Sequence, residues 1–155
     1  MSQGKIFEYQ TNVKWTGALS GELSSSGLSS IPFGAPVDFG GTGGQWTPEQ
    51  MLVASVEACT LMTFLAYAGR RGVKLVAYGS SARATLGRDT DGVMRFTSLV
   101  IQPVVRVEDE DSATAARELL AGIARKCFVG SSLIHEPRIE ATVEVAPSAS
   151  AVAAG

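Results

Sequence analysis

The chain carries little charge and no excess of either sign. Of its 155 residues, 13 are lysine or arginine and 15 are aspartate or glutamate, so the net charge is −2. Proteins that bind nucleic acids depend on clustered basic residues, and this sequence contains no basic run. We therefore expect no nucleic acid among its partners.

Cysteine and histidine are also scarce, with only Cys59, Cys127 and His135. Two cysteines do not make a disulfide scaffold, and with one histidine they cannot complete a four-ligand zinc site without carboxylates. No metal site is therefore expected, and a metal-assisted hydrolase is the weakest alternative. The thiols remain candidates for chemistry, although a free cysteine is commonly just a small buried apolar residue.

The sequence shows no sign of a secretory signal or a membrane span. Glu8 falls where a signal peptide would carry its apolar core, and no basic amphipathic targeting stretch follows it. The longest apolar run, 51–68, is interrupted by Glu57 and bracketed by Glu49 and Arg70–Arg71. We expect this run to be a buried helix in a cytoplasmic protein that has no membrane partner.

Apolar residues, in contrast, are abundant. They make up 45% of the chain, charged residues make up 18%, and the mean hydropathy is +0.17. This is a high apolar content for a soluble monomer, and it leaves apolar surface that must be covered. The composition therefore favours an oligomer.

Local patterns predict an α+β protein. A capping box, Thr47-Pro48-Glu49-Gln50, indicates where the first helix begins, and Asp91-Gly92 indicates a turn between two strands. The expected elements are a hairpin entered by strand 6–15, an irregular stretch 24–46, helix 51–68, strands 74–86 and 93–107, helix 113–126 and strand 138–145. The order ββ–α–ββ–α–β places helices between hairpins, which is typical of the α+β class. Residues 1–146 are expected to form one domain, and 147–155 a disordered tail rich in alanine and serine.

Two cysteine motifs carry a family resemblance. The helix Thr-Pro-Glu-Gln-Met-Leu-Val-Ala-Ser-Val-Glu-Ala-Cys-Thr-Leu-Met-Thr-Phe is followed by Arg-Arg-Gly-Val, and Lys126-Cys127-Phe128-Val129 precedes Ser131-Ser132-Leu133. Both resemble motifs of the OsmC/Ohr family, the osmotically inducible protein C and organic hydroperoxide resistance proteins. The resemblance covers about residues 5–145. It implies the OsmC-like fold, with a long central helix and an intertwined homodimer.

The resemblance also implies an activity. Family members of this kind are thiol peroxidases without a bound cofactor, in which Cys59 would attack the peroxide and Cys127 would be the resolving thiol. The substrate would be a small organic hydroperoxide, favoured by apolar residues such as Met62, Phe64 and Phe128. The reductant would be a dithiol such as a lipoyl group.

Glu49 matches the functional glutamate of the family motif, but its usual partner is missing. Peroxidatic members carry an arginine in the early hairpin, whereas this chain has none before Arg70, and Lys14 is the only cation nearby. Ten residues separate Glu49 from Cys59, a rise of about 15 Å, so a straight helix cannot bring both to one site within one chain. Glu49 of one subunit beside Cys59 of another would resolve this. The structural alternative is an acid that stabilises the helix N-terminus.

Two further residues have less certain roles. Glu57 lies nearly opposite Cys59 on the helix, so we expect it to find a basic partner elsewhere rather than to touch the thiol. His135 follows Cys127 by eight residues, and it is either half of a Cys–His pair or a solvated loop residue.

The sequence therefore predicts a thiol-dependent peroxidase that uses Cys59, Cys127 and Glu49. The alternative, favoured by the missing arginine, is a protein without enzymatic activity that binds a small hydrophobic ligand or senses oxidants through its thiols. The ionisation of Cys59 separates these two hypotheses, because only an enzyme needs its thiolate near neutral pH.

Overall fold

The computed structural model describes residues 4–147. The chain divides into two compact units at the boundary between Met51 and Leu52, and each is described by itself. A single domain over 1–146 therefore stays a prediction. The predicted tail, 147–155, lies outside the described residues except for Pro147.

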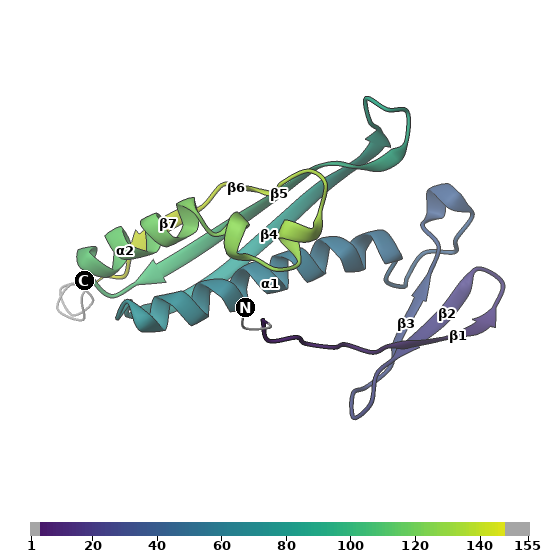
Figure 1. The fold of residues 1–155 in the computed structure, drawn as a ribbon, viewed down its shortest axis with the longest axis horizontal. Coiled ribbons are helices and arrows are strands. Elements are labelled where there is room, and N and C mark those ends of the chain that lie inside the picture. The colour runs from purple at the N-terminus through teal and green to yellow at the C-terminus, as the bar shows by residue number, and fades with distance from the viewer. Residues whose placement is uncertain (1–3, 148–155) are drawn as a thin grey trace, which may run out of the picture. The chain divides into compact units, whose positions relative to one another are not determined.

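The first unit holds a three-stranded antiparallel sheet in the order β1-β2-β3 (Figure 1). Its strands are β1 (Asn12–Gly17), β2 (Ser20–Ser24) and β3 (Ile31–Gly34), followed by a short 3-10 helix, Val37–Phe39. The predicted hairpin is confirmed, although its first strand begins at Asn12 rather than at Ile6. The prediction that 24–46 is irregular was wrong, because β3 pairs with β2 along four residues. Pro32 leaves residues 31–34 without a clear strand pattern in the sequence. Pairing with β2 nevertheless makes them a strand.

Helix α1 (Pro48–Arg70) begins at the predicted capping box. The Thr47 Oγ1 atom accepts a hydrogen bond from the Gln50 amide at 3.2 Å, and Gln50 Oε1 accepts one from the Thr47 amide at 3.1 Å. Two backbone donors at the helix start are thereby satisfied, and Pro48 has no amide hydrogen to satisfy. The local sequence is sufficient to fix this end of the helix.

The second unit is built on a long antiparallel hairpin, β4 (Leu75–Arg88) and β5 (Met94–Val107), as predicted. The expected last strand, 138–145, is instead two short strands, β6 (Arg138–Ile139) and β7 (Thr142–Val145), both parallel to β5. Pro103 lies in β5 between the residues that pair with β6 and those that pair with β7, and it has no amide hydrogen to donate. Strand 138–145 is therefore divided at the point where it passes Pro103 of β5.

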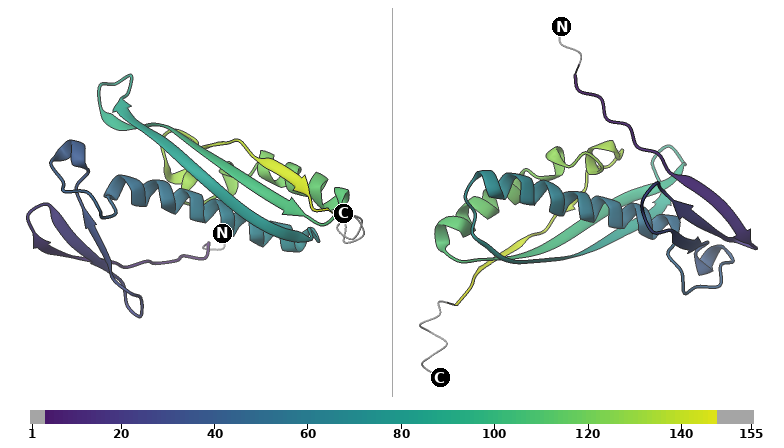
Figure 2. Two further views of the ribbon diagram at one scale, coloured as in Figure 1. Left: turned by 180° about the vertical axis from the view of Figure 1, so that it is seen from behind. Right: turned by 90° about the horizontal axis from the view of Figure 1, so that it is seen from below.

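Helix α2 (Glu110–Ala121) begins at Asp109, whose side chain accepts a hydrogen bond from the Ser112 amide. It ends earlier than the predicted 113–126, and a separate 3-10 helix, Ala124–Lys126, follows. Viewed from behind, the strands β4, β5 and β7 lie in front of both helices, so α1 and α2 cover the same face of the sheet (Figure 2). The described chain is α+β, with two α-helices and seven strands.

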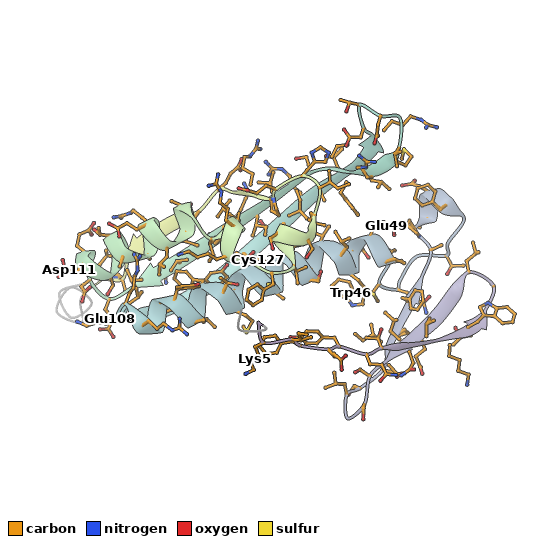
Figure 3. The ribbon with its side chains drawn as sticks, in the orientation of Figure 1. Lys5, Trp46, Glu49, Glu108, Asp111 and Cys127 are labelled. Atoms are coloured by element: carbon orange, nitrogen blue, oxygen red, sulfur yellow. The ribbon has the colours of Figure 1, made fainter. Side chains whose placement is uncertain are left out.

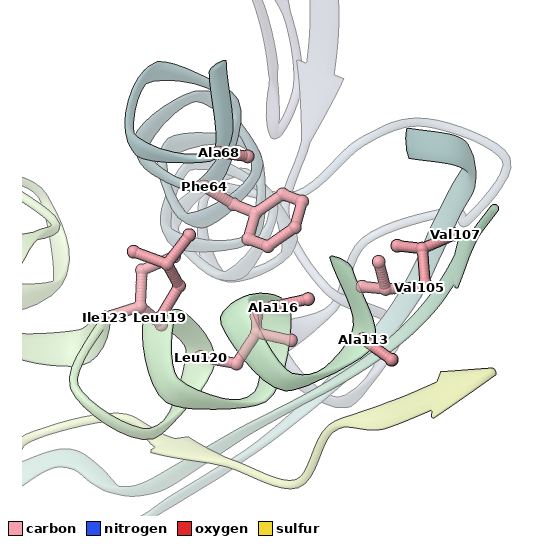
Figure 4. Close-up of a cluster of buried hydrophobic side chains, with 9 residues drawn as sticks. All are labelled: Phe64, Ala68, Val105, Val107, Ala113, Ala116, Leu119, Leu120 and Ile123. Atoms are coloured by element: carbon pink, nitrogen blue, oxygen red, sulfur yellow. The ribbon is translucent and has the colours of Figure 1, made fainter. Parts of the chain in front are cut away.

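The core of the second unit lies where α1, α2 and β5 meet (Figure 4). Its buried members are Phe64, Ala68, Val105, Val107, Ala113, Ala116, Leu119, Leu120 and Ile123. A second cluster joins Val56 of α1 to Leu99 and Ile101 of β5.

Helix α1 is buried along one stripe only, formed by Val56, Thr60, Phe64 and Ala68. Away from this stripe, Met62 is 57% exposed within the chain. By length and hydropathy alone, α1 is the one described helix that could cross a membrane. Its buried stripe packs on the sheet, as expected of a core helix.

Candidate active site

The fold brings Cys59 and Cys127 to the same place. Cys59 lies in the middle of α1 and is partly buried, whereas Cys127 lies just after the 3-10 helix Ala124–Lys126 and is 1% exposed. The Cys127 sulfur lies 4.0 Å from the Thr60 hydroxyl and 4.0 Å from the Val56 carbonyl, both on α1. Since 68 positions separate the cysteines in the sequence, only the packing of the segment after α2 against α1 reveals that they meet.

Cys127 lies in the segment between α2 and β6 (Figure 3), and the residues that follow it contact its sulfur. The Gly130 amide donates a hydrogen bond to Cys127 Sγ at 3.3 Å. A Cβ atom at position 130 would lie 3.3 Å from that sulfur and 3.3 Å from Pro137 Cγ. Glycine therefore allows the backbone to approach the thiol closely enough to donate.

The two thiols differ in their tendency to ionise. Burial by itself would raise the pKa of Cys59, but hydrogen bonding with Cys127, the Val129 backbone, Thr63 and the Phe128 backbone outweighs burial and lowers it. Burial raises the pKa of Cys127, and the neighbouring Cys59 raises it further. Of the two thiols, Cys59 is therefore the more readily ionised. A partly exposed thiol with a lowered pKa beside a buried thiol suits thiol–disulfide chemistry.

The groups that stabilise Cys59 were not found from the sequence. Thr63 lies four residues after Cys59, a spacing that places both side chains on one helical face, so it could have been recognised. The backbone groups of Phe128 and Val129 leave no signal in the residue types. Their role depends on how the segment folds over α1.

Glu49 lies in the first turn of α1, as predicted, and it does not approach Cys59 along the helix. Its Oε2 atom is buried and has no hydrogen-bond partner among residues 4–147. A buried carboxylate oxygen without a donor is costly, so this atom needs a partner that the described chain does not supply. Lys14 forms no ion pair within the same residues.

Glu57 faces the sheet and not the cysteines. It accepts a hydrogen bond from the Ser80 hydroxyl of β4, so the expected basic partner is replaced by a neutral donor. Burial, together with the charge of Glu57, raises the pKa of the nearby Tyr78 to about 12. The hydrogen bond between Glu57 and Ser80 links α1 to β4.

His135 is neither paired with a cysteine nor simply solvated, which corrects both expectations. Its Nε2 atom lies 2.6 Å from Asp89 Oδ2, at the end of β4. This links the segment after Cys127 to the hairpin.

An apolar cavity of about 360 Å³ opens within the second unit. Its lining is Leu52, Leu86, Met94, Arg95, Phe96, Leu99, Ser132, Leu133, Ile134 and His135. Of the apolar residues expected near the thiols, Phe64 is instead buried in the core against Tyr78. Met62 and Phe128 are exposed. Across the described part of the chain, no group of three or more histidine, cysteine or acidic residues is arranged to hold a metal ion.

Comparison with known proteins identifies the family to which this fold belongs. A family model described as OsmC-like protein matches residues 41–142, which is more than half of the chain. No curated protein matches the sequence.

Several solved structures share the fold. An OsmC-like protein of unknown function from Vibrio cholerae has a TM-score of 0.78 at 19% identity, covering 88% of this chain and 100% of its own. An organic hydroperoxide resistance protein from Elizabethkingia anophelis has a TM-score of 0.70 at 15% identity, with coverages of 93% and 100%. The structure of an organic hydroperoxide resistance protein OsmC from Legionella pneumophila has a TM-score of 0.63 at 19% identity, with coverages of 90% and 98%. The chain belongs to the OsmC-like protein family.

Proposed function

We propose that the protein is a thiol-dependent peroxidase that reduces organic hydroperoxides through Cys59 and Cys127. The observation that carries the proposal is that two free thiols, 68 positions apart in the sequence, meet on α1, where the buried Cys127 packs beside the partly exposed Cys59. The pKa of Cys59 is lowered and that of Cys127 is raised, which agrees with these roles. A peroxidase needs a thiolate that attacks and a second thiol within reach that resolves the product. The hydroperoxide resistance proteins that share the fold support the same chemistry.

The reaction balances in three steps. The Cys59 thiolate attacks the outer oxygen of the hydroperoxide, the O–O bond breaks, and the alkoxide takes a proton to leave as an alcohol. The Cys127 thiol then attacks the Cys59 sulfenic acid, which forms a disulfide and releases water. A dithiol such as a lipoyl group finally reduces the disulfide and is itself oxidised to a cyclic disulfide.

The apolar cavity supports an organic substrate over hydrogen peroxide. Leu52 lies seven residues before Cys59 on α1, about 10 Å along the helix, and Leu133 lies six residues after Cys127. Helix α1 and the segment after Cys127 therefore contribute to the cavity lining beside the β4–β5 hairpin, although neither cysteine is part of that lining. Its size lies in the usual range for sites that take small ligands, and its apolar lining suits an alkyl or aryl group.

A homodimer completes the proposal. Large apolar side chains remain exposed on the chain, among them Trp15, Trp46, Met62, Leu65 and Phe128. A second copy would cover such surface and could supply the donor that Glu49 Oε2 lacks. We assign Glu49 to the site in this dimer, with residues 1–146 as one domain of each subunit. We place the protein in the cytoplasm, where free thiols stay reduced.

The test is the intact mass of the protein, with alkylation of free thiols, before and after one equivalent of cumene hydroperoxide. The wild type is expected to lose both thiols as one intramolecular disulfide, faster than with hydrogen peroxide. Cys127→Ser is expected to accumulate a sulfenic acid on Cys59, and Cys59→Ser to leave Cys127 unmodified.

Two free thiols after treatment, with slow alkylation, would overturn the proposal. The apolar cavity would then favour the binding of a small hydrophobic ligand. Formation of the disulfide without turnover by any dithiol would indicate a redox sensor.

A further inference from the structure

The pair formed by His135 and Asp89 connects two distant parts of the second unit. His135 belongs to the segment 128–136, which follows Cys127, and Asp89 lies at the tip of the β4–β5 hairpin. The Nε2 and Oδ2 atoms are 2.6 Å apart, and the Asp89 side chain is only 10% exposed. A short contact to a largely buried carboxylate is stronger than an ordinary surface ion pair.

Two groups other than His135 also fix the Asp89 carboxylate. The Arg95 guanidinium donates to Asp89 Oδ2 at 3.0 Å, and the Thr90 amide donates to Asp89 Oδ1 at 2.8 Å. Arg95 also contacts Asp91 at 2.7 Å, which fixes the guanidinium. Hydrogen bonds from His135 and the Thr90 backbone lower the pKa of Asp89 to about 2, so the carboxylate is ionised at neutral pH.

The segment 128–136 carries the backbone groups that act on both sulfurs. The Gly130 amide donates to Cys127 Sγ at 3.3 Å, and the Val129 and Phe128 backbones are among the groups that lower the pKa of Cys59. Most other hydrogen bonds of the segment are local: the Ser131 and Ser132 hydroxyls donate to the Phe128 carbonyl, and the Leu133 amide donates to the Gly130 carbonyl.

Few polar contacts fix this segment to the rest of the unit. Within the described residues, the ion pair of Glu136 with Arg125 spans 3.7 Å between exposed side chains. The contact between His135 and Asp89, at 2.6 Å, is shorter than this ion pair and joins the segment to the β4–β5 hairpin.

We infer that His135 and Asp89 are positioning residues, whose pair holds the segment 128–136 in the place where the Gly130 amide reaches Cys127 and the backbone of Phe128 and Val129 passes beside Cys59. The inference rests on the proposed function, which gives the Cys59 thiolate its role. Because an Nε2–H group donates in one neutral tautomer as well as in the imidazolium ion, the tie does not require a charged histidine. The tie acts on the thiol through geometry. His135 also lines the apolar cavity, and that role is separate from the tie.

The experiment measures the alkylation rate of Cys59 by iodoacetamide against pH, in a Cys127→Ser background that leaves one thiol. His135→Leu is expected to move the midpoint to higher pH by about half a unit, which slows alkylation at pH 7 about threefold. His135→Gln keeps an N–H donor and is expected to restore most of the wild-type profile. Asp89→Ala should match His135→Leu, and combining both should add nothing further.

Glu136→Gln is the matched control, because it removes the neighbouring exposed ion pair and should leave the profile unchanged. If His135→Leu keeps the wild-type midpoint, or if His135→Gln shifts it as far, the inference is overturned. Should the leucine variant fail to fold, the glutamine and Asp89→Asn variants decide. The inference then requires a raised midpoint in Asp89→Ala and midpoints nearer to wild type in the other two variants. A wild-type midpoint in Asp89→Ala, or equally raised midpoints in the other two, overturns it. Alkylation needs no peroxide, so failure of the peroxidase proposal is recognised separately.

Discussion

The hydroxyl oxygen of Thr63 lies 4.0 Å from the sulfur of Cys59, one turn further along α1. The contact belongs to a set of weak donors, each contributing little, that together outweigh the burial of the thiol. Cys59 therefore has no dedicated cation among its described neighbours, unlike the arginine expected from the family pattern. Its reactivity depends on hydrogen bonds from α1 and from the segment after Cys127.

Thr63→Val tests the contribution of the helix. The variant keeps the shape of the side chain and removes the hydroxyl, so the pKa of Cys59 is expected to rise. Alkylation of Cys59 at pH 7 should slow about twofold, since the thiolate fraction falls with each increase in pKa. Thr63→Ser retains the hydroxyl and should keep the original rate. An unchanged rate in the valine variant would show that the contact does not act on the thiolate.

Cys127 is expected to tune Cys59 as well as to resolve its product. Replacing it with alanine removes the neighbouring donor, so the pKa of Cys59 should rise and its alkylation at pH 7 should slow several-fold. Cys127→Ser retains a hydroxyl donor and should shift the pKa less. The pH dependence of Cys59 alkylation in the two variants measures the difference. Identical profiles would contradict a donor role for Cys127.

Gly130 is expected to be sensitive to substitution for a steric reason. An added Cβ would lie 3.3 Å from both Cys127 Sγ and Pro137 Cγ, in a part of the fold where Cys127 and Pro137 are both buried. Gly130→Ala should lower the free energy of unfolding by about 1–3 kcal/mol, as overpacking of a core usually does. Gly122→Ala, with no atom within 4 Å of its added Cβ, should change it by less than about 0.5 kcal/mol. Urea titration of both variants provides the comparison.

The features of the fold that the sequence predicts are local ones. The capping box at Thr47 and Gln50 is satisfied within four residues, and the Asp91-Gly92 turn joins two strands that pair directly. Such signals need no knowledge of distant residues. Strand β3 and the division of 138–145 were missed because both depend on a neighbouring strand. Pro103 can be read from the sequence, but the sequence does not show that strands β6 and β7 pair with β5 on either side of it.

The candidate site shows the same division. The residue types of Cys59 and Cys127 are evident from the sequence, and the family resemblance assigns their roles. Their proximity is not evident, because it arises from packing of Cys127 against the Val56 carbonyl and Thr60 on α1. The prediction of a basic partner for Glu57 was wrong for a similar reason, because the sequence does not reveal that Ser80 lies opposite it.

The N-terminus of α2 should make stability depend on pH. Hydrogen bonds from Lys74 first, and then from the Ser112 amide and hydroxyl, lower the pKa of Asp109 to about 2. The pKa of an unfolded aspartate is about 3.9, so the ionised group favours the folded state above that pH. This contribution is lost as the pH falls from about 4 toward 2.

Asp109→Asn isolates the charge, because asparagine is an equally good N-cap residue. The wild type should be more stable than the variant at pH 7, and the difference should shrink as the pH falls below about 4. Urea unfolding between pH 2 and 7 measures it. A constant difference between wild type and Asp109→Asn would mean that the carboxylate charge does not stabilise the helix start.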